Sequence, residues 1–143
     1  MKQGKYCEIT AIASRNLNEA KKAAASLEIP KAYGSYEELL TDTEIEAVYI
    51  PLPNHMHVEW AIKAMEAGKH VLLEKPVGLS SEQAESLIQA SKLNPSLKIM
   101  EAFMYRHHPQ WQKAKKLVSD RNIGTLKTIQ TFFSYYNTDP NNI

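Results

Sequence analysis

Short apolar runs alternate with longer amphipathic stretches along most of this chain. The apolar runs predict strands at residues 7–13, 32–33, 47–50, 71–73 and 98–102. Between the runs, apolar residues recur at helical spacing, and the clearest set is Val58, Ala61, Ile62 and Met65. This order predicts an α/β fold, in which helices pack on both faces of a parallel sheet.

Helix boundaries are marked by polar caps and by glycine or proline. Asn16, Ser35 and either Ser80 or Ser81 are suited to cap three helices. The predicted inner faces of two of these helices are formed by Ala20, Ala23, Ala24 and Leu27, and by Ala84, Leu87, Ile88 and Ser91. Pro30 is expected to end the first helix, and Gly4 and Gly68 are residues of the type that follows a helix.

The pattern changes after Ala102. An aromatic loop precedes a helix whose predicted inner face is formed by Trp111, Ala114, Leu117 and Val118. Residues 125–136 then have the β-branched and aromatic content of a strand in an antiparallel sheet. We therefore predict two domains, at residues 1–103 and 104–143, of which the second is only the start of an α+β domain.

The stretch His70–Pro76 carries the first candidate for chemistry. Pro76 cannot continue a central strand, so Glu74 and Lys75 are expected at the carboxyl end of the strand, where open α/β sheets bind ligands. There, Lys75 could hydrogen-bond a substrate hydroxyl, favour its ionisation and position its carbon for hydride transfer, with Glu74 as its partner. The alternative is a surface ion pair at the end of a strand.

Two further segments follow predicted strands. Ser14 and Arg15 stand where dinucleotide-binding folds hold the adenosine ribose, and an arginine there suits the 2′-phosphate of NADP. Alternatively, Asn16 caps a helix and Arg15 is a solvated charge. Asn54 and His57 offer polar groups to a ribose or a nicotinamide amide, unless this is only a rigid loop in which Asn54 or His55 caps a helix.

Composition and charge exclude several classes of function. The chain has 143 residues, 43% of them hydrophobic, and a net charge of +1, which provides no broad field for nucleic acid or an anionic membrane. Cys7, the single cysteine, is expected to be a buried thiol in the reducing cytoplasm, and no signal peptide or membrane span is visible. A metal site formed by His55, His57, His107 and His108 is disfavoured, because no cysteine or paired carboxylate accompanies them.

Five motifs in this order resemble the Gfo/Idh/MocA family of nicotinamide-dependent oxidoreductases. They are Ala13–Arg15, Tyr33–Tyr36, Pro53–His57, Ala67–Pro76 and Tyr105–Pro109. The resemblance covers nearly the whole chain, and Gly-Lys-His followed by Glu-Lys-Pro is its most specific part. It implies a Rossmann domain followed by a domain with an open antiparallel sheet. It also implies hydride exchange between NADP, or NAD, and a sugar, cyclitol or related polyol.

The resemblance assigns roles to individual residues. Lys75 matches the catalytic lysine, and Pro76 follows a peptide bond that is often cis. The implied cofactor contacts are Ser14, Arg15, Pro51, Leu52, Asn54, His57, Glu74, Lys75 and Arg106. Homo-oligomerisation through the sheet of the second domain is also implied.

The chain departs from the family pattern at both ends. It contains no G-x-G-x-x-G, so the first strand and the glycine-rich turn that receives the pyrophosphate are expected to be missing. The missing strand would lie between those at residues 7–13 and 47–50. The downstream aspartate and histidine of the family are also absent. Two hypotheses follow. The first is that the chain is an NADP-dependent oxidoreductase. The second is that it is a truncated non-catalytic remnant, or an interaction module, with the same partial fold.

Overall fold

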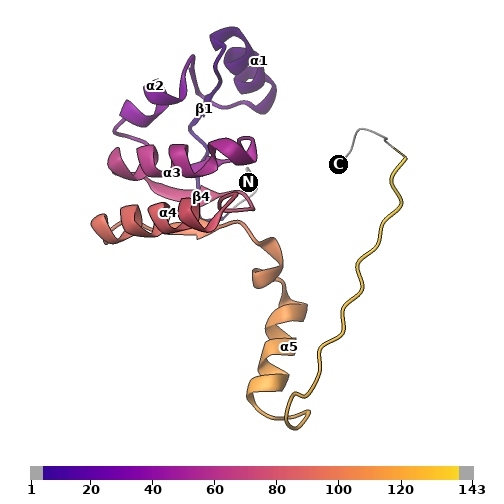
Figure 1. The fold of residues 1–143 in the computed structure, drawn as a ribbon. Helices are drawn as coiled ribbons and strands as arrows, with labels where there is room; N and C mark the ends of the chain where they lie inside the picture. Colours follow the sequence, from indigo (N-terminus) through magenta and orange to yellow (C-terminus); the bar gives the residue numbers. More distant parts are fainter. Residues whose placement is uncertain (1–4, 139–143) are drawn as a thin grey trace. The chain divides into compact units, whose positions relative to one another are not determined.

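The computed structural model describes residues 5–138, so the predicted helix end at Gly4 lies outside the described part. The chain divides into two compact units, Met1–Phe103 and Met104–Ile143. The first unit contains five strands, which are β1 (Ala11–Ala13), β2 (Lys31–Tyr33), β3 (Ala47–Ile50), β4 (His70–Leu73) and β5 (Ile99–Glu101). Its helices are α1 (Leu17–Leu27), α2 (Tyr36–Thr41), α3 (His57–Glu66) and α4 (Ser81–Leu93), with a short 3-10 turn η1 (Asn54–Met56) before α3 (Figure 1).

All strand pairings in the described residues are parallel, as predicted. The strands form two separate sheets, one with the order β1-β2 and one with the order β3-β4-β5. Ala13 pairs with Tyr33 in the first sheet, and Leu73 pairs with Ile50 and Glu101 in the second. Within residues 5–138, β1 and β3 are not paired, so the sheet is interrupted at the predicted place.

The hydrophobic core lies between the three-stranded sheet and the helices α3 and α4, which run side by side (Figure 1). Val71 and Leu73 point into this core, because alternate residues of a strand face the same side. The residues that meet them there are Ile50, Val58, Trp60, Ala61, Ala64, Met65 and Leu87. Nonpolar burial on this face is therefore what holds the sheet and its two helices together.

The opposite face of the same sheet is open in the described residues. Tyr49, Leu72 and Met100 are neighbours across the three strands, and Tyr49 and Met100 are 40% and 44% exposed. The predicted cover on both faces of the sheet is therefore not found here within residues 5–138, and Leu72 is only half-buried. Alternation sends Leu72 away from the face that α3 covers.

The first strand is shorter than predicted. Only Ala11–Ala13 form β1, because pairing with β2 extends over three residues. Cys7 precedes this pairing and is exposed, so the prediction of a buried thiol is wrong.

Helix caps follow the predicted residues in three cases. The Asn16 side chain accepts from the Asn18 N–H at 2.9 Å, Ser35 accepts from Glu38, and Ser80 rather than Ser81 accepts from Gln83. The first helix ends at Leu27 rather than at Pro30, because Glu28 takes the left-handed conformation that stops it.

Two residues that were predicted to face inward are on the surface. Leu27 in α1 and Ile88 in α4 are 49% and 52% exposed, whereas Ala20, Ala24 and Leu87 on the same helices are buried. Each helix buries fewer of its apolar residues than the helical spacing predicted, so Leu27 and Ile88 remain exposed to solvent.

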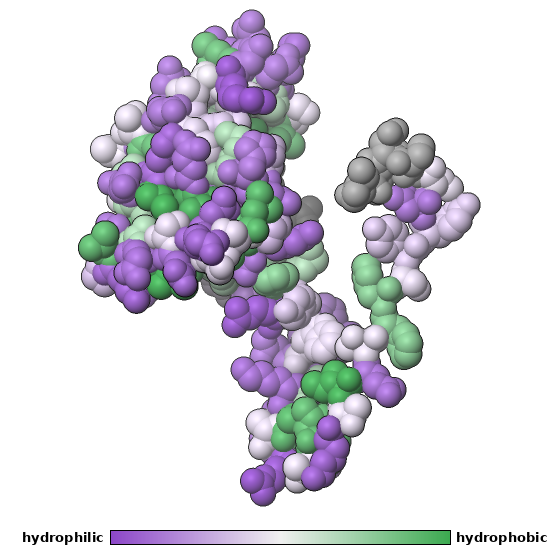
Figure 2. Space-filling view, in the orientation of Figure 1, coloured by the Kyte–Doolittle hydropathy of each residue, from purple (hydrophilic) through white to green (hydrophobic). Residues whose placement is uncertain are grey.

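The second unit contains the 3-10 turn η2 (Met104–His107) and the helix α5 (Pro109–Ser119), which the His108 side chain caps. Trp111 and Val118 were predicted to point inward, but they are 52% and 36% exposed. Residues 125–136 form no strand and their side chains are exposed, so the predicted strand is wrong; a strand needs a partner, and the described residues contain none for it. Figure 2 shows the resulting apolar surface on α5 and on the extended segment after it.

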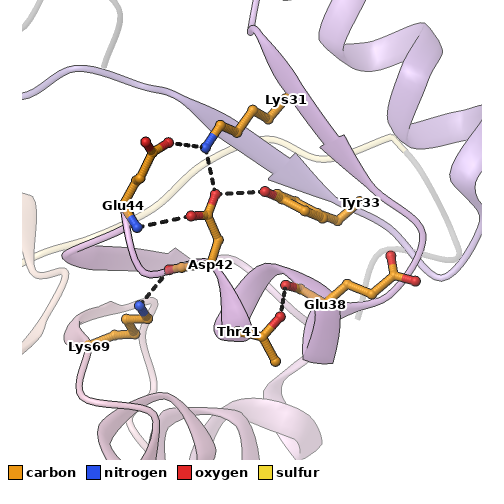
Figure 3. Close-up of polar contacts among 7 residues, drawn as sticks. All are labelled: Lys31, Tyr33, Glu38, Thr41, Asp42, Glu44 and Lys69. Carbon is orange, nitrogen blue, oxygen red and sulfur yellow. Dashed lines mark hydrogen bonds and ion pairs between the residues drawn. The ribbon is translucent and has the colours of Figure 1, made fainter.

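A polar network links the β1-β2 part of the first unit to the β3-β4-β5 part (Figure 3). The Asp42 carboxylate, just after α2, accepts from Lys31 Nζ at 2.8 Å and from the Tyr33 hydroxyl at 2.6 Å. Lys31 also forms an ion pair with Glu44, and the main-chain carbonyl of Asp42 accepts from the buried Lys69, just before β4, at 2.7 Å. Side chains thus make a connection that the two sheets do not make through their backbones.

The network shifts the titration of its members in opposite directions. Hydrogen bonds from Lys31, Tyr33 and the Glu44 N–H, in that order, hold the pKa of Asp42 well below its usual range. Hydrogen bonds to Asp42 and Glu44 raise the pKa of Lys31. The network is therefore charged throughout the neutral range.

An aromatic contact joins the same two parts. The rings of Tyr36 in α2 and Trp60 in α3 meet edge to face, with centroids 4.8 Å apart. Trp60 is 8% exposed, and the ammonium of Lys63 lies 4.3 Å from its ring centroid.

Candidate functional site

The carboxyl ends of β3, β4 and β5 bring together the segments that follow them. The Glu74 N–H donates to the Ile50 carbonyl at 3.1 Å, and the Ala102 N–H donates to the Leu73 carbonyl at 2.8 Å. Beyond β4, the Val77 N–H donates to the Glu101 carboxylate at 2.9 Å. Three loops therefore share one edge of the sheet, the place where open α/β sheets bind ligands.

Lys75 lies on this edge with its side chain exposed, just before a cis peptide bond to Pro76. Its ammonium makes no hydrogen bond or ion pair with another residue of the described range 5–138. The alternative interpretation, a surface ion pair with Glu74, is therefore not what the structure shows. The three N–H donors of Lys75 remain available to a bound molecule.

Glu74 is held by a tyrosine instead. The Tyr49 hydroxyl donates to Glu74 Oε1 at 2.6 Å, and the Lys75 N–H donates to Glu74 Oε2 at 3.3 Å. The hydrogen bond from Tyr49 is the largest influence that lowers the pKa of Glu74, followed by the Lys75 N–H and the charges of Lys75 and His57. Glu74 is therefore an oriented carboxylate beside Lys75, and the same bond raises the pKa of Tyr49.

The segment after β3 is tied to the segment after β4 by His57. This residue is 0% exposed, and its Nδ1 lies 2.7 Å from the Pro76 carbonyl oxygen. Its Nε2 lies 2.7 Å from the Leu52 carbonyl oxygen. Because both ring nitrogens already have main-chain partners, a polar contact with a cofactor would require one of these bonds to break.

The rest of this segment is more accessible. Pro51 and Asn54 are exposed and Leu52 is half-buried. Neither Asn54 nor His55 caps α3, since Met56 takes the cap position without a side-chain hydrogen bond. The proposed capping role is thus wrong, and the Asn54 amide is left at the surface of the candidate site.

Ser14 and Arg15 follow the other sheet. The Ser14 N–H donates to the Tyr33 carbonyl at 3.2 Å, which places both residues at the carboxyl end of β1. The Ser14 hydroxyl accepts from the Asn16 N–H at 3.4 Å, whereas the exposed guanidinium of Arg15 has no partner within residues 5–138. A planar fork with five free donors beside a hydroxyl is suited to a phosphate group.

Arg106 belongs to the second unit, where it lies in η2 with an exposed side chain. Its main-chain carbonyl accepts a hydrogen bond from the Gln112 side chain. Its role near a cofactor stays a prediction.

Tyr49 and Glu101 are parts of this edge that sequence reasoning missed. Their contacts depend on strand register, since Tyr49 pairs with Leu72, two residues before Glu74, and Glu101 pairs with Leu73. The alternation of β3 predicts which face Tyr49 occupies, but only the order of the strands shows that Glu74 is its neighbour.

No group of three or more metal-binding side chains comes together within residues 5–138. Likewise, none of the helices in that range is long and apolar enough to cross a membrane.

Comparisons with known proteins identify the family and the fold of this chain. Residues 1–103 match the family described as "Oxidoreductase family, NAD-binding Rossmann fold". The chain belongs to the Gfo/Idh/MocA family. As a member, it shares the parallel sheets, the flanking helices and the NAD(P)-binding character of that family.

Curated Gfo/Idh/MocA relatives are much longer than this chain. An uncharacterised oxidoreductase of Rhizobium meliloti is 51% identical over 136 residues, which are 95% of this chain and 40% of the relative. The D-xylose 1-dehydrogenase (NADP(+)) 2 of Haloferax volcanii is 42% identical over 128 residues, which are 90% of this chain and 39% of the relative. The chain therefore spans about two fifths of the length of these relatives.

Solved structures show the same fold. KijD10, a 3-ketoreductase from Actinomadura kijaniata in complex with TDP-benzene and NADP, matches with a TM-score of 0.74 and 37% identity, over 83% of this chain and 37% of that one. The apo scyllo-inositol dehydrogenase from Lactobacillus casei matches with a TM-score of 0.78 and 30% identity, over 85% and 36%.

Proposed function

We propose that this chain carries the NADP-binding part of an oxidoreductase that transfers hydride between nicotinamide and a carbon of a sugar, cyclitol or related polyol. The observation that carries the proposal is the exposed ammonium of Lys75, which has no partner in the described residues and lies at the carboxyl end of β4. Relatives that act on D-xylose and on inositol support the class of substrate.

Lys75 is the proposed catalytic residue. Its side chain would hydrogen-bond the reacting hydroxyl; the neutral amine would take up the proton that the hydroxyl loses on oxidation, and the resulting ammonium would return it on reduction. Glu74 would stabilise the ammonium that forms on Lys75 and direct this side chain along the edge of the sheet. The Tyr49 hydroxyl would fix Glu74 in turn, through the 2.6 Å bond between them.

The cofactor contacts divide between the two sheets. Arg15 and Ser14 would bind the 2′-phosphate of NADP. NAD is the alternative cofactor, and the D-xylose dehydrogenase and KijD10 support the preference for NADP. Pro51, Leu52, Asn54 and Glu74 would line the nicotinamide side, where the bound cofactor supplies or accepts the hydride. Arg106 is a further proposed contact.

The proposal also includes the cellular compartment and the association of copies of the chain. The enzyme is expected in the cytoplasm, because Cys7 has no second cysteine in the chain with which to pair. Association of copies through the sheet of the second domain is also expected when that sheet is complete.

The first experiment is calorimetric titration of the chain with NADPH and with NADH, alongside thermal unfolding. We expect saturable binding, a preference for NADPH and a raised melting temperature. Arg15→Ala should weaken NADPH binding by about tenfold or more while changing NADH binding little. The matched control is Lys21→Ala, which removes an exposed positive charge from α1. Equal affinity for both cofactors would contradict the role of Arg15.

Turnover tests the catalytic residue. In a preparation that reduces NADP with a polyol, Lys75→Ala should lower the rate of hydride transfer by about a hundredfold or more, with NADPH affinity unchanged. Lys92→Ala, which removes an exposed lysine of α4, should retain the rate. An unchanged rate in Lys75→Ala would remove this lysine from the mechanism.

The second candidate is a non-catalytic interaction module with the same partial fold. It is favoured by the exposed apolar side chains between Leu126 and Tyr136, which suit contact with another polypeptide. Cooperative unfolding without any binding of NADPH or NADH would support it against the enzyme.

A further inference from the structure

His57 is the most completely buried polar side chain at the candidate site. Its exposed fraction is 0%, and it lies at the first position of α3, below the loops that follow β3 and β4. The two carbonyl oxygens that its ring contacts come from Leu52 and Pro76, so one ring spans both loops. Pro76 is the residue directly after Lys75, and Leu52 belongs to the loop proposed for the nicotinamide side.

The chemistry of these contacts restricts the protonation state of the His57 ring. A carbonyl oxygen only accepts hydrogen bonds, and a neutral imidazole has one N–H donor and one lone pair. With both nitrogens 2.7 Å from carbonyl oxygens, a neutral ring would set its lone pair against the lone pairs of one carbonyl. A ring that carries a proton on each nitrogen satisfies both contacts, and a buried polar group without a partner is costly.

The charged groups near the ring are compatible with a cation. Glu74, at the end of β4, is a negative group within electrostatic range of His57. Glu101, at the end of β5, binds the Val77 N–H in the same turn as Pro76. The basic residues on the surrounding segments are Lys75 and His55, and both are exposed.

We propose that His57 is a positioning residue whose ring donates from both nitrogens and so ties the loop after β3 to the loop after β4. The tie sets the distance between the backbone of the nicotinamide-side loop and the backbone that carries Lys75. His57 would thus act on the reaction through Lys75, without touching the cofactor. The geometric part stands by itself, and the effect on the reaction rests on the proposed function.

The first test observes the protonation of the ring directly. The chain is labelled with ¹⁵N, and the histidine ring nitrogens are recorded by long-range ¹H–¹⁵N correlation at neutral pH without cofactor. We expect both nitrogens of His57 to bear a proton, whereas the exposed His55 gives the averaged signals of a ring in exchange with water. A lone pair on either nitrogen of His57 would overturn the proposal.

The second test measures whether the His57 ring stabilises the loops after β3 and β4. His57→Gln is compared with the matched control His55→Gln by amide hydrogen exchange. Loss of the tie should speed exchange at the hydrogen-bonded amides of Glu74 and Val77 by about tenfold or more, while amides inside α3, such as that of Met65, change little. The control should leave all of these rates unchanged, and loop exchange at the wild-type rate in His57→Gln would show that the ring only fills space.

These two tests are independent of the proposed function. If His57→Gln fails to fold, the wild-type spectrum alone still decides whether the ring donates twice. If the chain binds no NADPH while the ring does donate twice, the proposed function fails and the tie between the loops stands.

Discussion

The β3-β4-β5 part and the β1-β2 part of the first unit are stabilised by different interactions. In the β3-β4-β5 part, nine buried residues form one apolar cluster around Leu73, Met65 and Ala61. In the β1-β2 part, the buried residues are few, chiefly Ala20, Ala24 and Ile29. That part is joined to the rest by the Asp42 network and by the Tyr36–Trp60 contact. Burial of apolar area does not depend on pH and is not screened by salt, whereas the interactions of a charged network depend on pH and are screened, so the two parts should fail under different conditions.

The largest effect is expected from a cavity in the apolar part. Leu73→Ala removes a side chain that is 0% exposed, and the cavity should lower the free energy of unfolding by about 2–5 kcal/mol. Urea unfolding followed by circular dichroism measures the loss. Leu93→Ala, at an 82% exposed position of α4, is the control and should change stability by no more than about 0.5 kcal/mol. Equal effects at both positions would mean that the cluster is not the core.

A smaller and more local effect is expected from the polar network. Asp42→Asn keeps the shape of the side chain but removes the negative charge that Lys31 and Tyr33 bind. Amide exchange should become faster in β1 and β2, while the amides of Val71 and Leu73 keep their protection. Thr43→Ala, at the neighbouring exposed position, serves as the control. Uniformly faster exchange in both sheets would show that the two parts open as one.

Acid should distinguish the two parts without any mutation. The pKa of Asp42 is lowered in the folded chain, so its contribution is present above the unfolded value of about 4 and is lost as the pH falls below it. The β1-β2 part should therefore lose protection from exchange first on acidification. The pKa of Lys31 is raised in the folded chain, so the stability that Lys31 contributes is lost only at alkaline pH. Exchange measured down the pH series on wild type and Asp42→Asn tests this expectation. The variant should show the smaller acid loss.

The smallest effect is expected at the candidate site itself. Tyr49→Phe removes the hydroxyl that lowers the pKa of Glu74, and this pKa should rise toward its ordinary range with little change in overall stability. A carboxyl-resolved NMR titration measures the shift. Tyr6→Phe, at a 92% exposed position, is the control, and an unchanged Glu74 titration in Tyr49→Phe would mean that the 2.6 Å bond is not maintained in solution.

Local sequence patterns predicted much of this molecule because their causes are local. Apolar alternation located the five strands of the parallel sheets, and the caps at Asn16 and Ser35 depend only on the next three residues. Proline chemistry likewise placed Glu74 and Lys75 at the end of β4. These features need no knowledge of what packs against them.

The errors have the opposite origin, because each depended on a distant partner. The predicted strand at residues 125–136 and the burial of Trp111 both required a partner surface that the described residues do not contain. The cofactor contact at His57 stays a prediction, and the sequence could not show that two main-chain carbonyls take both ring nitrogens. The Tyr49–Glu74 bond likewise depends on which strands are neighbours.

The position of Trp60 makes the chain its own optical reporter. Its indole is enclosed by the Tyr36 ring from one part of the first unit and by the Lys63 ammonium of α3. Separation of the two parts would expose the indole to water, and its emission would shift to longer wavelength. The second tryptophan, Trp111, is already half in solvent and would contribute a nearly constant background. Fluorescence of the Trp111→Phe chain would therefore follow one event, the opening of the β1-β2 part.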